Sequence, residues 1–242
     1  MSEILKINDL WGGYKEGVDI LRGISMEVQR GEAVGIIGLN GSGKSTFGKS
    51  IMNMIPIRKG QIIFEGEDVT ALTTSELSHR GISIMQQGGK VFRNLSVWDN
   101  LQLASNNSQL STLNSQLSEV VPLLSRPKKE LQHMMADKLS GGQKHQLSLA
   151  MTLATEPHLV ILDEPSAGLS PIAVEEMYQM LRDIKEKLNV TTILIEQNIS
   201  KAVEFCHRNI LIQQGDISMV YKHANITDVE KFMFWKGVQN VQ

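Results

Sequence analysis

The amino-acid sequence predicts an α/β fold: a mainly parallel sheet flanked by helices, an antiparallel β segment at the N-terminal end and a helical lobe. Residues 4–29 carry alternating and β-branched apolar residues, as antiparallel strands do, with breaks at Gly12, Gly13 and near Gly23. Beyond residue 33, short apolar runs alternate with helical patterns, which is typical of parallel strands joined by helices. A chain of 242 residues, 41% of them hydrophobic, can bury one sizeable core, or a main domain with a smaller lobe.

The later strands and helices are read from apolar periodicity and from proline positions. The run at 159–162 is continuously apolar, as expected of a strand buried on both faces. Pro56 is expected to stop the first helix, and Pro171 to open the third. The expected strands cover residues 33–37, 61–64, 82–85, 159–162, 191–195 and 209–212. The expected helices cover residues 46–55, 143–153, 171–188 and 199–205.

A helical lobe is expected between about residues 97 and 132, where the pattern is helical but polar. Within it, residues 105–118 are rich in Ser, Asn and Gln. That composition is typical of a loop or a loosely packed lobe, so we do not expect this part to belong to the central core.

The composition excludes several classes of protein. The formal net charge is −2, which implies no general attraction to nucleic acid, and no nucleic-acid partner is expected. Cys206 is the single cysteine, so no disulfide forms within the chain and a reducing compartment is expected. The first residues lack the pattern of a secretory signal, and no stretch approaches the roughly 20 apolar residues that span a bilayer. We therefore expect a cytosolic chain.

A glycine-rich motif follows the strand expected at 33–37. Residues 38–45 read GLNGSGKS, which fits G-x-x-x-x-G-K-[ST] between a strand and a helix. Glycines let successive N–H groups face phosphate oxygens, and the helix start adds a positive dipole. Lys44 would contact the β- and γ-phosphates, and Ser45 would offer a hydroxyl to Mg²⁺. The residues assigned to nucleotide binding here are Gly38, Asn40, Gly41, Ser42, Gly43, Lys44, Ser45 and Thr46.

An acidic pair ends the strand expected at 159–162. The run LVILDE places Asp163 and Glu164 at the C-terminal end of a buried strand, where α/β sheets place their ligands. Asp163 can hold Mg²⁺ through water, and Glu164 can polarise an attacking water. Alone, such a pair could merely end a strand. Together with the phosphate loop it predicts hydrolysis of a nucleoside triphosphate.

Residues 139–143 read LSGGQ at the start of an expected helix. Physically, a serine followed by glycines is an N-cap and an anion site. In this order and context LSGGQ is the signature of ATP-binding-cassette (ABC) ATPases, and the chain resembles that family along nearly its whole length. The resemblance implies that this loop closes over the γ-phosphate of ATP held by a partner copy. The residues concerned are Leu139, Ser140, Gly141, Gly142 and Gln143.

Lesser motifs fit the same resemblance. Tyr14 matches the aromatic residue that stacks on adenine, although a strand aromatic packed in the core is the alternative. Gln87 matches the glutamine that contacts Mg²⁺ and water and links the site to the membrane partner. Gln86 leaves this register open by one residue, and Gln87 is preferred because a glycine pair follows it. The loop at 167–170 matches the family's dimer contact but ends in Ser170 where Asp is usual, so Asp-mediated communication between two sites is not expected to be retained.

The largest departure from the family pattern is Gln197, where most members have a histidine that contacts the γ-phosphate. Glutamine can donate a hydrogen bond but carries no charge, so hydrolysis is expected to be slower or to depend more on Glu164. His207 lies too far along the chain to substitute and is expected at the surface. The residues assigned to catalysis are Glu164, Gln197 and Gln87, and those assigned to the metal are Ser45, Gln87 and Asp163.

Longer stretches are similar to the ATPase subunits of branched-chain amino acid importers: QQGGKVFRNLSVWDNL, SAGLSPIAVEEMYQML and ILIEQN. Urea and short-amide importers use similar subunits, and the ATPases of lipopolysaccharide extraction share F-R-x-L-[ST]-V-x-[DE]-N. Gln86 departs from the importer pattern, which usually has Pro there. The resemblance implies import of branched-chain amino acids or a related small polar solute. The alternatives are an ATPase of envelope lipid export, a soluble ATPase of iron–sulfur cluster assembly, and a catalytically silent regulatory subunit.

The resemblance also implies cofactors, partners and domain limits. ATP and Mg²⁺ are the expected cofactors. The expected partners are a second copy or a related ATPase subunit, transmembrane permease subunits and, indirectly, a solute-binding protein, which would place the chain peripherally on the cytosolic face of the inner membrane. Residues 1–242 should form a single domain of the P-loop NTPase class. Its core with the β subdomain is expected over about 1–86 and 155–242, and its helical subdomain, with the signature loop, over about 87–154.

Overall fold

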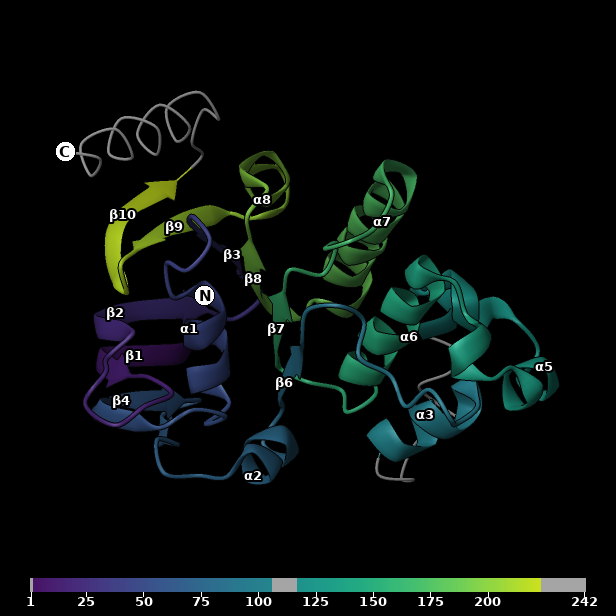
Figure 1. Ribbon diagram of the computed structural model, residues 1–242, viewed down its shortest axis with the longest axis horizontal. Helices are drawn as coiled ribbons and strands as arrows, with labels where there is room; N and C mark the ends of the chain where they lie inside the picture. The colour runs from purple at the N-terminus through teal and green to yellow at the C-terminus, as the bar shows by residue number, and fades with distance from the viewer. Residues whose placement is uncertain (1, 106–116, 223–242) are drawn as a thin grey trace. The chain divides into compact units, whose positions relative to one another are not determined.

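Contacts within the chain define two compact units in the computed structural model, which describes residues 2–105 and 117–222 (Figure 1). The first unit comprises Met1–Thr74 and Thr191–Gln242, and the second Ser75–Val190.

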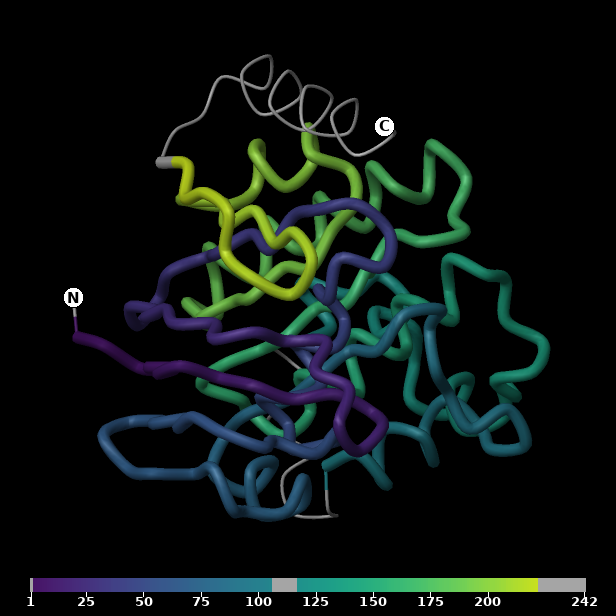
Figure 2. Tube along the Cα trace, turned by 60° about the vertical axis from the view of Figure 1, so that its left-hand side comes forward, coloured from purple at the N-terminus to yellow at the C-terminus, as the bar shows by residue number. Residues whose placement is uncertain are grey.

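The alternating apolar residues near the N-terminus form an antiparallel sheet, which confirms the prediction. On β1, Leu5 and Ile7 are buried, whereas Lys6 between them is partly exposed and pairs with Glu27 of β2. Figure 2 shows the purple trace of β1 running between β2 and β4. In the order β2-β1-β4-β5, the strands are Leu21–Gln29, Glu3–Gly12, Ile57–Phe64 and Glu67–Asp68. One face of these strands therefore supplies apolar core, and the other carries charge.

Continuous apolar runs in the same unit form a mainly parallel sheet. β3 pairs in parallel with both β8 and β9, and every residue of β3 and β8 is buried. Helices α1 (Lys44–Ile51) and α8 (Ile199–Phe205) contact these strands. In the order β10-β9-β3-β8, the strands are Asp216–Lys222, Arg208–Gln213, Ala33–Ile37 and Thr191–Glu196. The register pairs Ile37 with Glu196, so the loop that follows β3 leaves the sheet beside Glu196.

The second unit combines a parallel strand pair with helices. β6 (Ile82–Met85) pairs in parallel with β7 (Leu159–Asp163). Helix α6 contacts α3, α7 and β6, so it links the helices of this unit to its strands. The longer helices in the described part of this unit are α3 (Val97–Ala104), α5 (Lys128–His133), α6 (Gly141–Leu153) and α7 (Pro171–Leu188), with 3₁₀ turns at Pro122–Ser125 and Ala136–Lys138. A short helix α2 (Thr74–His79) begins at the boundary of the units.

The region predicted to be a polar helical lobe contains α3 and α5, but residues 106–116 lie outside the described part of the chain. Within the described residues, no helix has both the length and the apolar character that crossing a bilayer requires.

Tertiary contacts explain where the elements depart from the expected limits. α1 ends at Ile51, well before Pro56, because Asn53 adopts a left-handed conformation with φ of 49°. The side-chain amide of Asn53 donates from Nδ2 to the carbonyl oxygen of Leu72 at 2.6 Å, so a distant segment holds the helix end. β2 runs through Gly23, whose positive φ accompanies a register shift against β1. That glycine marks a bulge and not the predicted strand end.

The hairpin that joins β9 to β10 is absent from the sequence-based expectation. Gln214 and Gly215 have φ of 51° and 83°, as a two-residue turn of the I′ type requires. Glutamine is not one of the residues that usually signal this turn, so the sequence gives only a weak indication of it.

Candidate functional site

Glycines shape the loop between β3 and α1. Gly41 and Gly43 have φ of +77° and +108°, a region that favours glycine. At Gly38, a Cβ would clash with the carbonyl oxygen of Ile212 and lie 2.7 Å from Ser42 Oγ. Gly43 is the N-cap of α1 and has no side chain to cap its first N–H groups. The chain therefore turns sharply into a helix start of the kind that binds phosphate.

Lys44 and Ser42 supply the polar side chains inside this loop. Lys44 is 4% exposed, and its Nζ donates to the carbonyl oxygens of Gly38 and Leu39 at 2.8 and 3.0 Å. Ser42 Oγ is buried and has no hydrogen-bond partner among the described residues. A buried hydroxyl without a partner is unfavourable, and an anion seated in the loop would accept its proton. The loop therefore fits a phosphate group.

The other residues predicted to bind nucleotide vary in exposure. Asn40 is exposed, Ser45 is half-buried and Thr46 is buried. Tyr14 lies on the loop after β1 and is 52% exposed, with Lys49 Nζ 5.8 Å from its ring centre. Tyr14 is thus not packed in the core, and its ring offers a face on which a base could stack.

Gln197 lies directly after β8 and is exposed. Glu196, the last residue of β8, is 4% exposed, and its Oε2 accepts hydrogen bonds from the N–H groups of Gln197 and Asn198 at 3.0 and 3.2 Å. This carboxylate fixes the backbone where the sequence predicts a γ-phosphate contact. His207 is exposed, as predicted, and its Nδ1 accepts from the N–H of Ala33 at 2.9 Å.

The acidic pair lies in the second unit. Asp163 ends β7 and is 2% exposed, and Glu164 follows it at 8%. Glu164 has φ of +48°, which costs a non-glycine residue roughly 1–2 kcal/mol. Gln87 Nε2 donates to Glu164 Oε2 at 2.6 Å. Gln87, the glutamine preferred from the sequence, therefore contacts the acidic pair directly.

The LSGGQ loop is held by a reciprocal cap at the start of α6. Ser140 Oγ accepts from the N–H of Gln143 at 3.2 Å, and Gln143 Oε1 accepts from the N–H of Ser140 at 3.0 Å. Because Ser140 Oγ is the acceptor in this pair, its own proton can be donated elsewhere. Leu139 is buried, whereas Gly141 is exposed. The loop is thus anchored at one end and presents a hydroxyl and glycine N–H groups at the other.

Ser170 caps the next long helix. Its Oγ accepts from the N–H of Ala173 at 3.4 Å, and Pro171 opens α7. A serine keeps the capping function that Asp would also provide, without the negative charge. A Cβ on Gly142 would lie 3.7 Å from the Ala173 Cβ, so this helix start lies close to the signature loop.

Sequence reasoning missed two buried polar residues beside the predicted ones, Glu196 and His145. A charged residue at the end of an otherwise apolar strand was the available signal for Glu196. His145 is 5% exposed on α6, and its only signal was a histidine on a helix face that packs inward.

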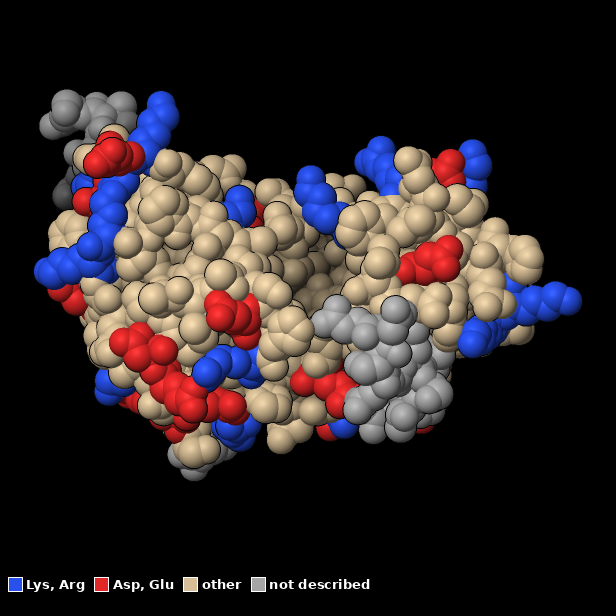
Figure 3. Space-filling model, turned by 90° about the horizontal axis from the view of Figure 1, so that it is seen from below, with Lys and Arg blue, Asp and Glu red and all other residues tan. Residues whose placement is uncertain are grey.

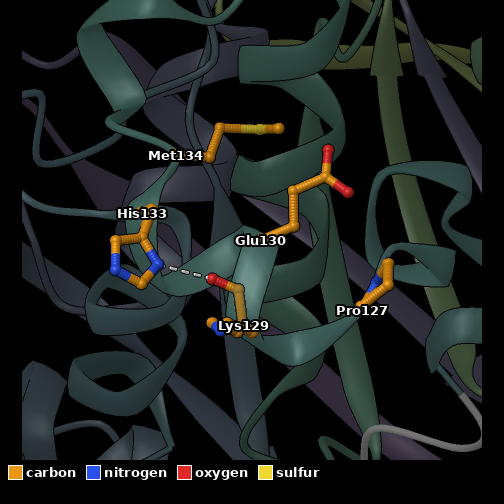
Figure 4. A pocket seen from close by; sticks show the side chains of 5 residues that line it. All are labelled: Pro127, Lys129, Glu130, His133 and Met134. Carbon is orange, nitrogen blue, oxygen red and sulfur yellow. Dashed lines mark hydrogen bonds between the residues drawn. The ribbon is translucent and has the colours of Figure 1, made fainter.

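Two surface features lie apart from the predicted site residues: a pocket on α5 and a mixed pattern of charge. A pocket of about 540 Å³ on α5 is lined by Pro127, Lys129, Glu130, His133 and Met134 (Figure 4). None of these residues belongs to the predicted nucleotide site. On the face seen in Figure 3, basic and acidic side chains are interspersed over most of the surface, and a run of basic side chains lies along its upper left edge.

The family follows from these features and from comparison with known proteins. Residues 21–167 match the family model described as ABC transporter, and this span contains the phosphate loop, the acidic pair and LSGGQ. The chain therefore belongs to the ABC transporter family, and it is an ATP-binding, ATP-hydrolysing transporter subunit.

The relatives are named for transport of different substrates. The chain is 32% identical over 206 residues to the high-affinity branched-chain amino acid transport ATP-binding protein BraG of Pseudomonas aeruginosa, covering 85% of this chain and 88% of BraG. It is 29% identical over 228 residues to the lipopolysaccharide export system ATP-binding protein LptB of Acidithiobacillus ferridurans, covering 94% of each. The probable branched-chain amino acid transport ATP-binding protein LivF of Archaeoglobus fulgidus is 29% identical over 235 residues, with 96% of each covered.

Solved structures confirm the predicted fold class. The chain superimposes on cbiO1 from Clostridium perfringens, part of the ABC transporter complex cbiONQ, with a TM-score of 0.79 and 26% identity, covering 100% of this chain and 96% of that one. Superposition on a nucleotide-free ATP-binding cassette from an ABC transporter gives a TM-score of 0.79 at 25% sequence identity, with 94% of each chain covered.

Proposed function

We propose that this chain is the ATPase subunit of an importer for branched-chain amino acids or a related small polar solute. The observation that carries the proposal is the similarity to BraG over 85% of the chain, because that relative is named for branched-chain amino acid transport. The run ILIEQN, with its buried Glu196 and exposed Gln197, adds support because it departs from the histidine of most family members in the way that these importer subunits do.

ATP would be held through its phosphates by the loop after β3. The N–H groups at the start of α1 and the hydroxyl of Ser42 donate to phosphate oxygens. Lys44 Nζ, which donates to the carbonyl oxygens of Gly38 and Leu39, would donate to oxygens of the β- and γ-phosphates in their place. Tyr14 provides the stacking face for adenine.

The oxygen donors assigned to the metal suit Mg²⁺. Ser45 offers a hydroxyl and Asp163 a carboxylate. Gln87 Nε2 already donates to Glu164, so its Oε1 is the atom left to face a cation or a water. Among the described residues, no group of three or more His, Cys, Asp or Glu side chains could hold a metal by itself.

Hydrolysis would depend on Glu164 as the residue that orients the attacking water. Its left-handed backbone and its hydrogen bond with Gln87 hold the carboxylate in one place. Gln197 can donate a hydrogen bond to the γ-phosphate but supplies no positive charge. The rate is therefore expected to depend on Glu164 more strongly than in relatives with a histidine.

A second ATPase chain would complete each site. The exposed Ser140 can donate its hydroxyl proton while it still caps α6, and the glycine N–H groups beside it favour an anion. We propose that this loop contacts the γ-phosphate bound by the second chain. That chain is either a second copy or a related ATPase subunit.

Permease subunits would dock on the second unit. Phe92 and Leu103 are each 56% exposed and Met135 is 39% exposed, so each offers apolar surface to a partner. Hydrogen bonds from the N–H of Val97 to the carbonyl oxygen of Met134, and from Ala136 to Leu95, align the segments that carry Phe92 and Met135. An apolar surface of this kind suits a short amphipathic helix on the cytosolic side of a permease. The chain would then lie peripherally on the inner membrane, and a solute-binding protein would select the cargo.

Envelope lipid export is the second candidate. The similarity to LptB covers 94% of both chains, more than the similarity to BraG covers, although the identity is 29%. The stretch FRNLSVWDN is compatible with both functions.

Copurification of the tagged chain from native membranes tests the proposal. Mass spectrometry should identify permease subunits, and the complex in proteoliposomes should hydrolyse ATP faster when a binding protein loaded with leucine, isoleucine or valine is added. Stimulation by lipopolysaccharide, with none by these amino acids, would replace import by lipid export.

A further inference from the structure

His145 is a buried histidine on the helix that follows the signature loop. It lies two residues after Gln143 in α6 and is 5% exposed. Its Nδ1 lies 2.7 Å from the carbonyl oxygen of Pro165. A carbonyl oxygen only accepts hydrogen bonds, so Nδ1 must carry the proton and donate. The ring is thereby hydrogen-bonded to Pro165, the residue that directly follows Glu164.

The His145 ring also lies close to the turn after Gln87. A Cβ added to Gly89 would lie 2.6 Å from His145 Cδ2 and 3.2 Å from its Cγ. The adjacent Gly88 would meet nothing within 4 Å. The ring of His145 therefore occupies the space beside Gly89 specifically, and only a residue without a side chain fits there.

These two contacts converge on the pair that is proposed to hold the attacking water. Pro165 is covalently joined to Glu164, and Gly89 is two residues from Gln87. The two side chains of that pair meet at 2.6 Å. One ring on α6 thus restrains both backbone segments that carry the pair.

We infer that His145 is a positioning residue for ATP hydrolysis, which couples the signature helix to the Gln87–Glu164 pair. The inference rests on the proposed function of Glu164. Helix α6 starts at the LSGGQ loop, so an ATP bound by a second chain acts on the same helix that carries His145. A small displacement of that helix would reach Glu164 through Pro165 and Gln87 through Gly89, because closely packed buried groups transmit shifts to their neighbours.

A purely structural histidine would have a different signature. It would contribute to the stability of α6, and its removal would lower the unfolding temperature without a selective effect on turnover. A positioning residue should change kcat while the affinity for ATP stays the same, because the phosphate loop is not altered.

Two substitutions separate the hydrogen bond from the bulk of the ring. His145→Leu keeps a side chain of similar size and removes the donor. His145→Asn places an amide N–H close to the position of Nδ1 and restores the donor to Pro165. His79→Leu is the matched control, because the Nδ1 of His79 also lies 2.7 Å from a backbone carbonyl oxygen but the residue is exposed on α2.

For His145→Leu we expect kcat to fall by about tenfold, which is equivalent to about 1.4 kcal/mol. The affinity for ATP should stay within about twofold of native. His145→Asn should recover most of the loss, and His79→Leu should behave as the native chain. Native kcat in His145→Leu overturns the inference. Loss of cooperative thermal unfolding in both His145 variants also overturns it, because the residue would then hold the fold and not the pair.

Glycine substitutions give an independent measurement. Both Gly88 and Gly89 have positive φ, +85° and +59°, and the second value is the easier one for a side chain to adopt. Gly89→Ala should nevertheless reduce kcat more than Gly88→Ala, because only an alanine at position 89 places a Cβ against His145. The reverse order contradicts the inference. The proposed function has its own test, which is the ATP hydrolysis rate of Glu164→Gln. If that variant hydrolyses ATP as fast as the native chain, the proposed function has failed independently of His145.

Discussion

Replacing Lys44 by alanine is expected to weaken ATP binding by roughly 10- to 150-fold. The Lys44 ammonium is almost fully buried and donates to two loop carbonyl oxygens, at 2.8 and 3.0 Å. Bound phosphate takes the place of those carbonyls, so the variant loses a charge-assisted hydrogen bond. Such bonds contribute about 1.5–3 kcal/mol each, which sets the expected range.

Titration with a fluorescent ATP analogue measures this loss directly. Lys59→Ala is the matched control, because it removes the same charge from the same unit. The Lys59 side chain is 66% exposed and pairs with Asp9 at 2.6 Å. Its removal should leave ATP affinity unchanged and alter stability by less than about 0.5 kcal/mol. An affinity of Lys44→Ala equal to that of the control would remove Lys44 from the nucleotide site.

Three further outcomes are expected. Gln197→His should fold normally, since the residue is exposed, and hydrolyse ATP at least as fast as the native chain; a fall of about tenfold or more would show that the site is tuned around glutamine. Hydrogen exchange should slow at residues 91–98 when permease subunits assemble with the chain, and protection at 14–19 in its place would mean that the docking surface is misplaced. Burial raises the pKa of Glu32, but hydrogen bonds from Arg208 and a backbone N–H outweigh it and leave the pKa below its ordinary value. Glu32→Gln should therefore be less stable than native at neutral pH, with the gap closing below about pH 4, and a gap that does not change in acid urea titrations would contradict this.

The parts of the fold that depend on local pattern could be predicted from the sequence. β3 and β6 have the predicted limits because short runs dominated by apolar residues mark strands that are largely buried, even where Gly35 or Ser83 interrupts the run. The end of α1 could not be predicted, since it depends on the contact between Asn53 and Leu72, 19 residues further along. The hairpin between β9 and β10 could not be predicted either, because its turn places glutamine in a conformation that Asn or Gly more often adopts.

The same division applies to the candidate site. The residues of GLNGSGKS and LSGGQ are contiguous, and each motif carries its own chemistry at a helix start. The contact between Gln87 and Glu164 joins residues 77 positions apart, so the sequence suggested both residues but not their hydrogen bond. The position of His145 on the inward face of its helix indicated burial, but its packing against Gly89 and its hydrogen bond to Pro165 leave no pattern in the sequence.

The most direct test of ATP hydrolysis at the assigned site is steady-state turnover of Glu164→Gln. The variant should bind MgATP with native affinity, turn over at least about 100-fold more slowly and elute as a dimer in size-exclusion chromatography with MgATP. Glu156→Gln is the matched control, because Glu156 has a similar left-handed backbone, with φ of 50°, in the same unit but is exposed. The control should hydrolyse ATP at the native rate. Native turnover by Glu164→Gln would contradict the assignment of the catalytic carboxylate and the hydrolytic mechanism built on it.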